Sequence, residues 1–211
     1  MAEVILIRAE DPQDHLMEYC ANAIQRGELV AIPSDTLYCL IADPLNLAAV
    51  SKVFEAKSRA WDRSLPFFVD SIDQVEKLAQ NVPSQFYLLA HRYWPGPLGL
   101  IVEAAPSVPL KVTGNTRRLS VRQPASVIAR KLLARCGTPL IATSANVSGH
   151  PTCSTAGEVL AALGRHLSVI VDSPLETNVA GATTVDLTGP RWRLIREGAV
   201  SEPEIREVVG E

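Results

Sequence analysis

Acidic residues are missing from the middle of this sequence: no aspartate or glutamate occurs between Ala104 and Gly157. The whole chain carries 20 lysines and arginines against 23 acids, for a formal net charge of −3, so the deficit is local. Such a segment indicates either a cationic surface that holds an anion or a basic face that meets solvent. The cations in this stretch are Lys111, Arg117, Arg118, Arg122, Arg130, Lys131 and Arg135.

Several other absences restrict the class of protein. No apolar run approaches 20 residues, and the start of the chain lacks a basic, extended apolar leader, so we expect neither a membrane span nor a secretory signal. The four cysteines show no CxxC spacing and no histidine at metal-ligand intervals, which favours packing roles in a reducing compartment, the cytoplasm, and no protein-held metal. The four histidines are scattered, so a Ser-His-Asp or metal-centred mechanism has little support.

Hydrophobic periodicity predicts strands and helices that alternate along all 211 residues. The expected strands are 4–7, 29–32, 65–69, 98–102, 119–122, 140–143, 169–172, 182–187 and 192–196. Helices are expected to begin at Asp11 (with Pro12 at the first helical position), Asn46, Ser71, Gln85, Ala125, Ser154 or Thr155, and Ser201. The pattern predicts a single α/β domain over residues 1–211, with a large mixed twisted sheet, flanking helices and several hairpin pairs.

Small polar and cationic side chains follow several of these elements. Ser34 and Thr36 follow a buried-looking strand, where α/β sheets place ligand contacts, although an ST-turn that closes the strand is the slightly favoured reading. Lys57 and Arg59, with Arg63 nearby, leave a helix end as exposed cations. The helix dipole explains one of these charges but not the set.

Ser144 and Asn146 follow another strand, where they could donate hydrogen bonds to a phosphate. The sequence has no GxxxxGK[ST] loop and no GxGxxG followed by an acid, so a bound nucleotide would need a less common scaffold.

At these residues the sequence resembles the YrdC/Sua5/TsaC family of threonylcarbamoyl-AMP synthases. The resemblance runs in order along nearly the whole chain and is most specific in its K-x-R and S-x-N pairs. The matching stretches are 32–38, 43–46, 57–59, 93–98, 121–124, 139–149, 183–187 and 195–200. The resemblance implies the short, single-domain type, with a YrdC-like fold that has a basic concave face.

The resemblance also implies a reaction and its partners. L-threonine, bicarbonate or CO2, and ATP would give threonylcarbamoyl-AMP and pyrophosphate, the first step of t6A formation at position 37 of tRNA. Downstream t6A transferase proteins would complete the modification. Mg²⁺ would arrive with ATP, because no dense carboxylate cluster is evident in the sequence. Catalysis would rest on positioning and cationic stabilisation of the phosphates.

Site roles follow from the resemblance, position by position. Lys57, Arg59, Ser144 and Asn146 are implied as the catalytic set. The residues implied at ATP are Lys57, Arg59, Arg63, Ser144 and Arg196. Those implied at threonine are Ser34, Thr36, Arg122 and Thr183, with Arg122 pairing the carboxylate. The chain departs from the family pattern where Cys39 stands in place of glycine, Ser34 in place of threonine and Arg63 in place of lysine or histidine.

Two other functions stay open at this point. An RNA-binding module without synthase activity would use the acid-free segment for a tRNA or other RNA backbone, and would not need Ser34, Ser144 or Asn146. A carbamoyl-transfer enzyme related to hydrogenase maturation is the other. The chain lacks the zinc-finger-like and acylphosphatase-like segments that accompany a similar domain there.

Overall fold

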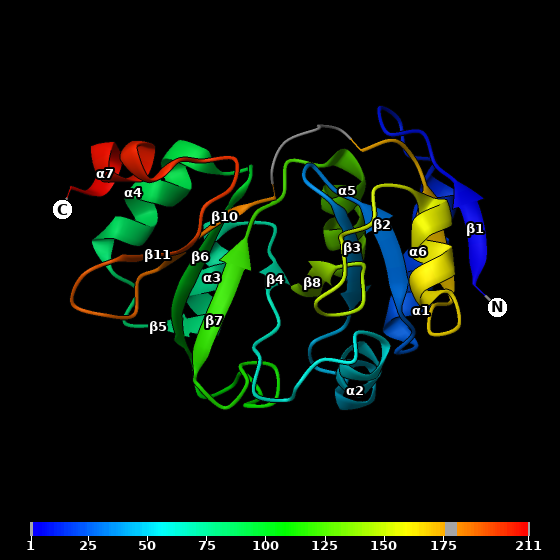
Figure 1. Cartoon of the computed structure of the whole chain (residues 1–211), viewed down its shortest axis with the longest axis horizontal. Helices are drawn as coiled ribbons and strands as arrows, with labels where there is room; N and C mark the ends of the chain where they lie inside the picture. The colour runs from blue at the N-terminus through cyan, green and yellow to red at the C-terminus, as the bar shows by residue number, and fades with distance from the viewer. Residues whose placement is uncertain (1, 176–180, 211) are drawn as a thin grey trace.

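The structure is a computed structural model that describes residues 2–175 and 181–210. These residues form an α/β architecture around one 11-stranded sheet (Figure 1). The strands are β1 (Glu3–Leu6), β2 (Val30–Pro33), β3 (Tyr38–Ala42), β4 (Phe67–Phe68), β5 (Ala79–Gln80), β6 (Leu98–Ala104), β7 (Arg118–Arg122), β8 (Leu140–Ser144), β9 (Val169–Asp172), β10 (Thr183–Asp186) and β11 (Arg193–Arg196). The helices are α1 (Asp14–Gln25), α2 (Leu47–Ala56), α3 (Ile72–Leu78), α4 (Ser84–Tyr93), α5 (Val127–Cys136), α6 (Ala156–Leu163) and α7 (Glu202–Val209).

The sheet is mixed, as the sequence predicts. Its strand order is β1-β9-β2-β3-β8-β4-β7-β6-β10-β11, with β5 paired beside β6. Strand β9 runs parallel to β1 and β2, whereas β2–β3, β6–β7 and β10–β11 are antiparallel pairs of strands that follow each other in sequence. Hairpin-like pairing of predicted strands is confirmed for β6–β7 and β10–β11, whereas β2–β3 includes a strand that was not predicted.

The sheet has two halves joined by a narrow strand. Figure 1 shows β1, β2, β3 and β8 grouped with α1, α2, α5 and α6. Together with β9, which lies between β1 and β2 in the sheet, we call these elements the first half. Strands β5, β6, β7, β10 and β11 group with α3, α4 and α7, which we call the second half. The two-residue strand β4 connects them, because it pairs with β8 on one side and with β7 on the other. Because β4 is parallel to β7 and antiparallel to β8, the carboxyl end of β7 lies level with the amino end of β8 across this junction.

The first half of the sheet is buried on both faces. On β2, Val30 and Ile32 pack with α1 and α5, whereas Ala31 belongs to the larger cluster that includes residues of α2 and α6. Strand β3 is buried along its whole length. Near-continuous apolar strands are what a sheet covered by helices on both faces requires.

Some element boundaries differ from the predictions. Helix α1 begins at Asp14 and not after Asp11; its N-cap is Gln13, and the exposed Asp11 carboxylate pairs with Arg8. Strand β3 was not predicted at all, because its short, fully buried apolar run has no alternation. Strand β4 is shorter than the expected 65–69, and Ser126 caps α5 two residues later than expected.

Within residues 2–175 and 181–210, none of the helices has the length and apolar character needed to cross a bilayer.

Candidate active site

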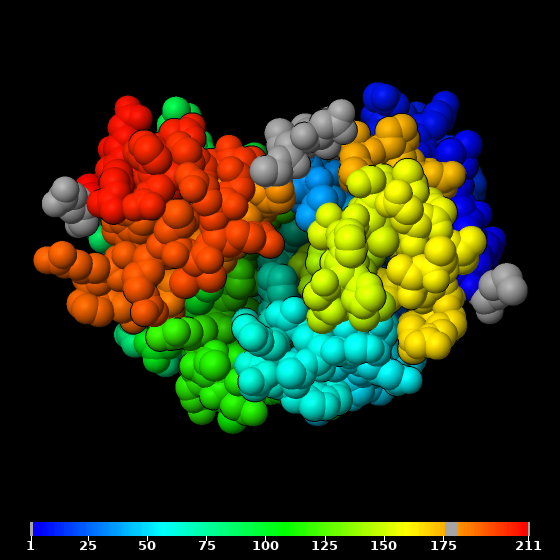
Figure 2. All heavy atoms as spheres, in the orientation of Figure 1, coloured from blue at the N-terminus to red at the C-terminus, as the bar shows by residue number. Residues whose placement is uncertain are grey.

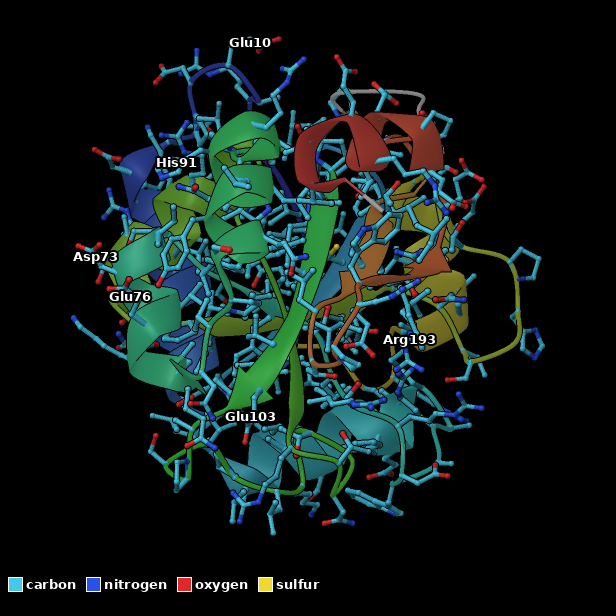
Figure 3. All side chains as sticks on the ribbon, turned by 90° about the vertical axis from the view of Figure 1, so that its left-hand side faces the viewer. Glu10, Asp73, Glu76, His91, Glu103 and Arg193 are labelled. Atoms are coloured by element: carbon cyan, nitrogen blue, oxygen red, sulfur yellow. The ribbon has the colours of Figure 1, made fainter. Side chains whose placement is uncertain are left out.

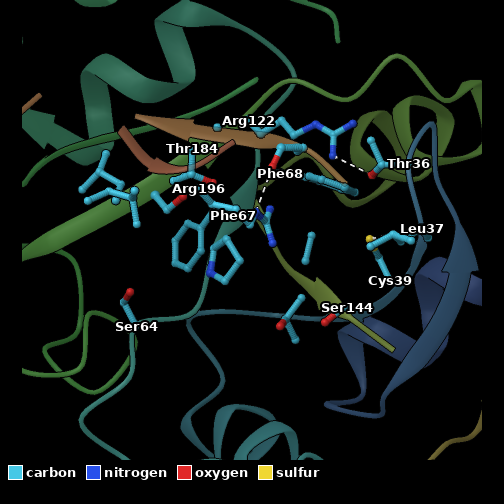
Figure 4. A pocket seen from close by; sticks show the side chains of 18 of the residues that line it. Thr36, Leu37, Cys39, Ser64, Phe67, Phe68, Arg122, Ser144, Thr184 and Arg196 are labelled. Carbon is cyan, nitrogen blue, oxygen red and sulfur yellow. Dashed lines mark hydrogen bonds between the residues drawn. The ribbon is translucent and has the colours of Figure 1, made fainter. Parts of the chain in front are cut away.

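A cavity of about 340 Å³ opens where the two halves of the sheet meet. Figure 2 shows the hollow between the β10–β11 side of the molecule and the segment that follows β8, and Figure 4 shows its wall. Three arginines line it: Arg59, Arg122 and Arg196. Its described lining includes no aspartate or glutamate. A cavity lined by several guanidinium groups and hydroxyls is suited to an anionic ligand.

Several carboxylates lie on the outer surface of the second half, away from the cavity lining. Figure 3 shows Asp73 and Glu76 on α3, and both side chains are exposed to solvent. Glu103 on β6 accepts hydrogen bonds from Gln80 and Asn81. Of the three lining arginines, Arg122 pairs with Asp35, so the positive potential of the described wall rests mainly on Arg59 and Arg196.

The end of α2 sends Lys57 and Arg59 to different places. Lys57 is the C-cap, and Ser58 has a left-handed backbone with φ of 46°. The N–H groups of Ser58 and Arg59 donate to the carbonyls of Glu55 and Phe54, the pattern of a Schellman motif. The helical turn directs Lys57 inward, whereas Arg59 lies beyond the reversal and reaches the cavity wall.

Lys57 is buried, contrary to the expectation of an exposed cation; 2% of its surface remains accessible. Its ammonium donates to the backbone carbonyl of Ser144, to the carbonyl of Asn146 at 2.8 Å and to Asn146 Oδ1 at 3.3 Å. Three acceptors match the three donors of an ammonium group. Burial, followed by the nearby charge of Arg59, lowers the pKa of Lys57 to about 8.

The segment after β8 is held by these same contacts. Asn146 is buried, and its Nδ2 donates to the carbonyl of His150 at 2.6 Å. The backbone N–H of Ser148 donates to the carbonyl of Lys57 at 2.8 Å. Ser144 lines the cavity, whereas Asn146 supports the loop from behind. The K-x-R and S-x-N pairs therefore meet in space, as the sequence predicts.

Arg59 is only partly satisfied by protein groups. One terminal nitrogen donates to the carbonyl of Ser64 at 2.8 Å, but its buried Nε has no hydrogen-bond partner. Burial and the charge of Arg63 both lower the pKa of the Arg59 guanidinium. A buried donor without a partner is a place where a ligand acceptor would be stabilised. Arg63 itself is exposed and lies outside the cavity lining.

Arg122 is buried in the wall on the other side. Its Nε donates to the carbonyl of Gly96 at 2.8 Å, one terminal nitrogen donates to Thr36 Oγ1 at 3.0 Å, and the other forms a short ion pair with Asp35. These bonds use three of five N–H donors and fix the plane of the guanidinium. Sequence reasoning missed Asp35, although it stands beside Thr36 in the same motif.

Arg196 lies at the rim of the cavity. Its Nε donates to the carbonyl of Ala182 at 3.0 Å, and burial lowers the pKa of its guanidinium, with the charge of Arg122 as the second cause. Its terminal nitrogens are the part of the side chain available to a ligand.

Two of the residues expected at threonine have their hydrogen bonds inside the protein. Ser34 Oγ donates to the carbonyl of Leu37 at 2.6 Å and accepts from the N–H groups of Thr36 and Leu37, so it closes the turn between β2 and β3. Thr183 Oγ1 donates to the carbonyl of Val200 and accepts from the N–H groups of Gly198 and Val200. Both side chains are fully buried and absent from the cavity lining, and their direct contact with threonine stays a prediction. Thr36 does line the cavity.

The cavity lining includes Cys39, which the comparison with the family pattern singled out, and two phenylalanines that it did not. Cys39 lies directly opposite Ser144 in the β3–β8 register, and both side chains line the wall. Burial raises the pKa of the Cys39 thiol. Phe67 and Phe68 of β4 contribute apolar surface. The register that places Cys39 opposite Ser144 could not be expected, because β3 was not predicted.

Several cations of the acid-free segment pair with acids from other parts of the chain. Arg122 pairs with Asp35, Arg118 with Asp186, and Lys131 and Arg135 with acids of α1. Lys111 donates to Ser51 Oγ and lies over the ring of Trp61. Carboxylates distant in sequence thus neutralise much of a charge that appears isolated along the chain.

Comparison with known proteins places the fold and the cavity in context. The Sua5/YciO/YrdC family model, described as telomere recombination, matches residues 22–198. The chain belongs to this family. The threonylcarbamoyl-AMP synthase of Pyrococcus abyssi is 37% identical over the whole of this chain, which spans 62% of that protein's length. A putative threonylcarbamoyl-AMP synthase of Mycobacterium tuberculosis is 37% identical over 90% of this chain and 87% of its own length.

Solved structures agree with this family membership. The crystal structure of P. abyssi Sua5 complexed with L-threonine superposes with a TM-score of 0.95 at 36% identity, covering all of this chain and 62% of that one. Escherichia coli YciO shares the fold, with a TM-score of 0.86 over 94% of this chain and 97% of its own, at 21% identity.

Proposed function

We propose that this member of the Sua5/YciO/YrdC family is a threonylcarbamoyl-AMP synthase, a nucleotidyltransferase that uses L-threonine, bicarbonate or CO2, and ATP. The observation that carries the proposal is the cavity wall, in which Arg59, Arg122 and Arg196 surround one space beside Ser144. The superposition with Sua5 complexed with L-threonine supports an amino acid as one substrate.

The chemistry divides between the two sides of the cavity. In the first step the neutral threonine amine adds to CO2 and gives a carbamate, with one proton released to solvent. Arg122 would pair the threonine carboxylate through its two remaining N–H donors. Its other donors are fixed by Gly96, Thr36 and Asp35, so the guanidinium is oriented before substrate arrives. Preorganised donors of this kind lower the cost of binding.

In the second step a carbamate oxygen attacks the α-phosphorus of ATP. The new O–P bond forms as the bond to pyrophosphate breaks, and negative charge spreads over the phosphate oxygens. Arg59, with its unpartnered Nε, and Arg196 would stabilise that charge, and the Ser144 hydroxyl would donate a hydrogen bond. No group of metal-ligating side chains of the kind that could hold an ion occurs among the described residues. Mg²⁺ would accordingly come with the triphosphate, held by its oxygens.

Transfer to adenosine 37 of tRNA belongs to the same proposal and would require the downstream t6A proteins. The RNA-binding alternative finds less support, because most cations of the acid-free segment are paired with acids.

Omission of single substrates tests the proposal. Purified protein is incubated with ATP, threonine and bicarbonate, and pyrophosphate release is measured with each component left out. Release that requires all three, with threonylcarbamoyl-AMP identified by mass spectrometry, is the expected result. Release that is independent of threonine would contradict the assignment.

A further inference from the structure

Lys57 stands at the centre of the contacts that bring the two signature pairs together. It follows α2 directly and lies two residues from Arg59, yet it is 2% exposed and does not line the cavity. Its ammonium makes its hydrogen bonds to protein oxygens of the segment after β8. These contacts occupy the donors that a phosphate would otherwise accept from.

We infer that Lys57 is a positioning residue: it fastens the 144–146 segment to the end of α2, and so fixes Ser144 relative to Arg59. The inference rests on the proposed function, because it assigns Lys57 a role in presenting other groups to ATP and not in touching the phosphates itself.

The contacts between the two segments run in both directions. Lys57 Nζ donates to oxygens of Ser144 and Asn146, and the carbonyl of Lys57 accepts from the N–H of Ser148 at 2.8 Å. Asn146 joins the same network from the other side through its bond to His150. A segment held by hydrogen bonds at several points has fewer accessible conformations, so the Ser144 hydroxyl is held at one position on the cavity wall.

The left-handed residue between the two cations completes the arrangement. Ser58 reverses the chain so that Arg59 reaches the cavity while Lys57 stays behind it. Arg59, after the end of α2, and Ser144, at the end of β8, therefore depend on one buried ammonium group for their relative position.

A double-mutant cycle with Lys57→Met and Ser144→Ala tests the inference. Each single variant is expected to lower kcat/KM for ATP by about 10- to 150-fold, the usual effect of losing a hydrogen bond to a charged group. If Lys57 acts through Ser144, the double variant is no worse than the more damaged single variant. If Lys57 contacts the phosphates directly, the two factors multiply, and that result would overturn the inference.

Amide hydrogen exchange in the absence of substrate gives an independent readout. The Ser148 amide should exchange faster in Lys57→Met than in the wild type, and should keep its wild-type rate in Ser144→Ala. Lys52→Met is the matched control, because Lys52 lies on the same helix and also donates to a backbone carbonyl, that of Gly27 at 2.8 Å. It should change neither exchange at Ser148 nor turnover. Unchanged Ser148 exchange in folded Lys57→Met would reject the inference.

If Lys57→Met does not fold, Asn146→Ala takes its place in both measurements. It removes one acceptor of the ammonium and the bond to His150, and should show the same faster exchange at Ser148 and the same non-additivity with Ser144→Ala. Full additivity with unchanged exchange would again reject the inference. Wild-type protein that shows no threonine-dependent pyrophosphate release would contradict the proposed function. The hydrogen-exchange comparison needs no substrate, so it tests the contacts of Lys57 with the 144–146 segment independently of that function.

Discussion

Arg122 is the buried cation whose replacement should separate threonine binding from ATP binding. Arg122→Lys keeps the charge but loses the planar fork that Gly96, Thr36 and Asp35 hold in place. We expect the threonine KM to rise about 10- to 100-fold while the ATP KM changes little. Pyrophosphate release titrated with each substrate measures both constants. An equal rise in both would show that Arg122 does not act on threonine alone.

Lysine suits this test better than alanine. Removing the guanidinium would leave the buried Asp35 carboxylate without its ion-pair partner, at a cost of about 3–5 kcal/mol, and lost folding would obscure the kinetics.

Lys57 predicts a pH dependence in which activity and stability change in opposite directions. Its pKa in the folded protein, about 8, lies below the ordinary lysine value of 10.5. Between these values the unfolded chain binds more protons, so this group's destabilising effect fades as pH rises from about 8 toward 10.5. Activity should fall over the same range, because a neutral amine offers only two donors to three oxygens.

Rate and unfolding measurements on wild type and Lys57→Met between pH 7 and pH 10 check this prediction. The low activity of Lys57→Met should be flat where the wild type declines. A wild-type profile that stays level to pH 10 would count against a functional role for the charge of Lys57.

Sequence reasoning identified chemical types better than contacts at this scale. It placed Lys57, Arg59, Ser144 and Asn146 together, and they are together. It treated Lys57 as exposed, because a cation that follows a helix end usually is. No local sequence feature indicates that Lys57 donates to the backbone carbonyls of residues 144 and 146. For Ser34 the ST-turn reading is the one that the structure bears out.

The left-handed end of α2 makes Ser58 a sensitive position at the level of the element. A non-glycine residue in this conformation costs about 1–2 kcal/mol, and a β-branched one more. Ser58→Gly should therefore keep activity and stability, whereas Ser58→Val should lower both. Thermal unfolding and ATP titrations measure the two effects, and the ATP KM of Ser58→Val should rise because Arg59 is displaced. Equal behaviour of the glycine and valine variants would argue against a required reversal.

Helices α1 and α5 provide a test of the RNA-binding alternative. Lys131 and Arg135 pair with Asp14 and Glu18 of α1, and such exposed pairs contribute about 0–1 kcal/mol each. Replacing Arg130, Lys131 and Arg135 by glutamine should lower the thermal midpoint slightly and leave ATP-dependent synthesis unchanged. Arg26→Gln, which breaks the exposed pair with Glu28, is a matched control.

RNA titrations at two salt concentrations complete this test. We expect weak binding that the triple variant hardly changes, because acids already occupy two of the three cations. A large loss of RNA affinity, with a reduced salt slope, would favour RNA binding by this face.

Elements with strong local signals were predictable, and elements defined by their neighbours were not. The caps at Asn46 and Ser71 and the capping box of Ser201 and Glu204 are local, and all are present. Strand β3 exists because β2 and β8 lie on either side of it, and its apolar residues carry no periodic signal. The start of α1 was placed too early because its N-cap, Gln13, makes no side-chain cap and so gives no local signal.

At the scale of the whole molecule, the cavity depends on the junction between the two halves. Arg59 and Ser144 belong to the first half, and Arg122 and Arg196 to the second, while Phe67 and Phe68 of β4 lie between them. The sequence predicted these residues as separate strand and helix ends. It could not show that a two-residue strand brings them around one space, because that follows from pairings between residues about 50 to 75 positions apart.

Ligands should consequently stabilise both halves together. A non-hydrolysable ATP analogue and threonine are each added at about 100 times their Kd. Each ligand should raise the free energy of unfolding by at most about 2.7 kcal/mol, which corresponds to about 5–10 °C in the thermal midpoint for a domain of this size. Hydrogen exchange should slow in β8 of the first half and in β10 and β11 of the second. Ser144→Ala and Arg196→Ala, one from each half, should each reduce the shift produced by the nucleotide analogue. Protection confined to one half would mean that the nucleotide does not bridge the junction, and Arg196 would then have to be removed from the proposed ATP site.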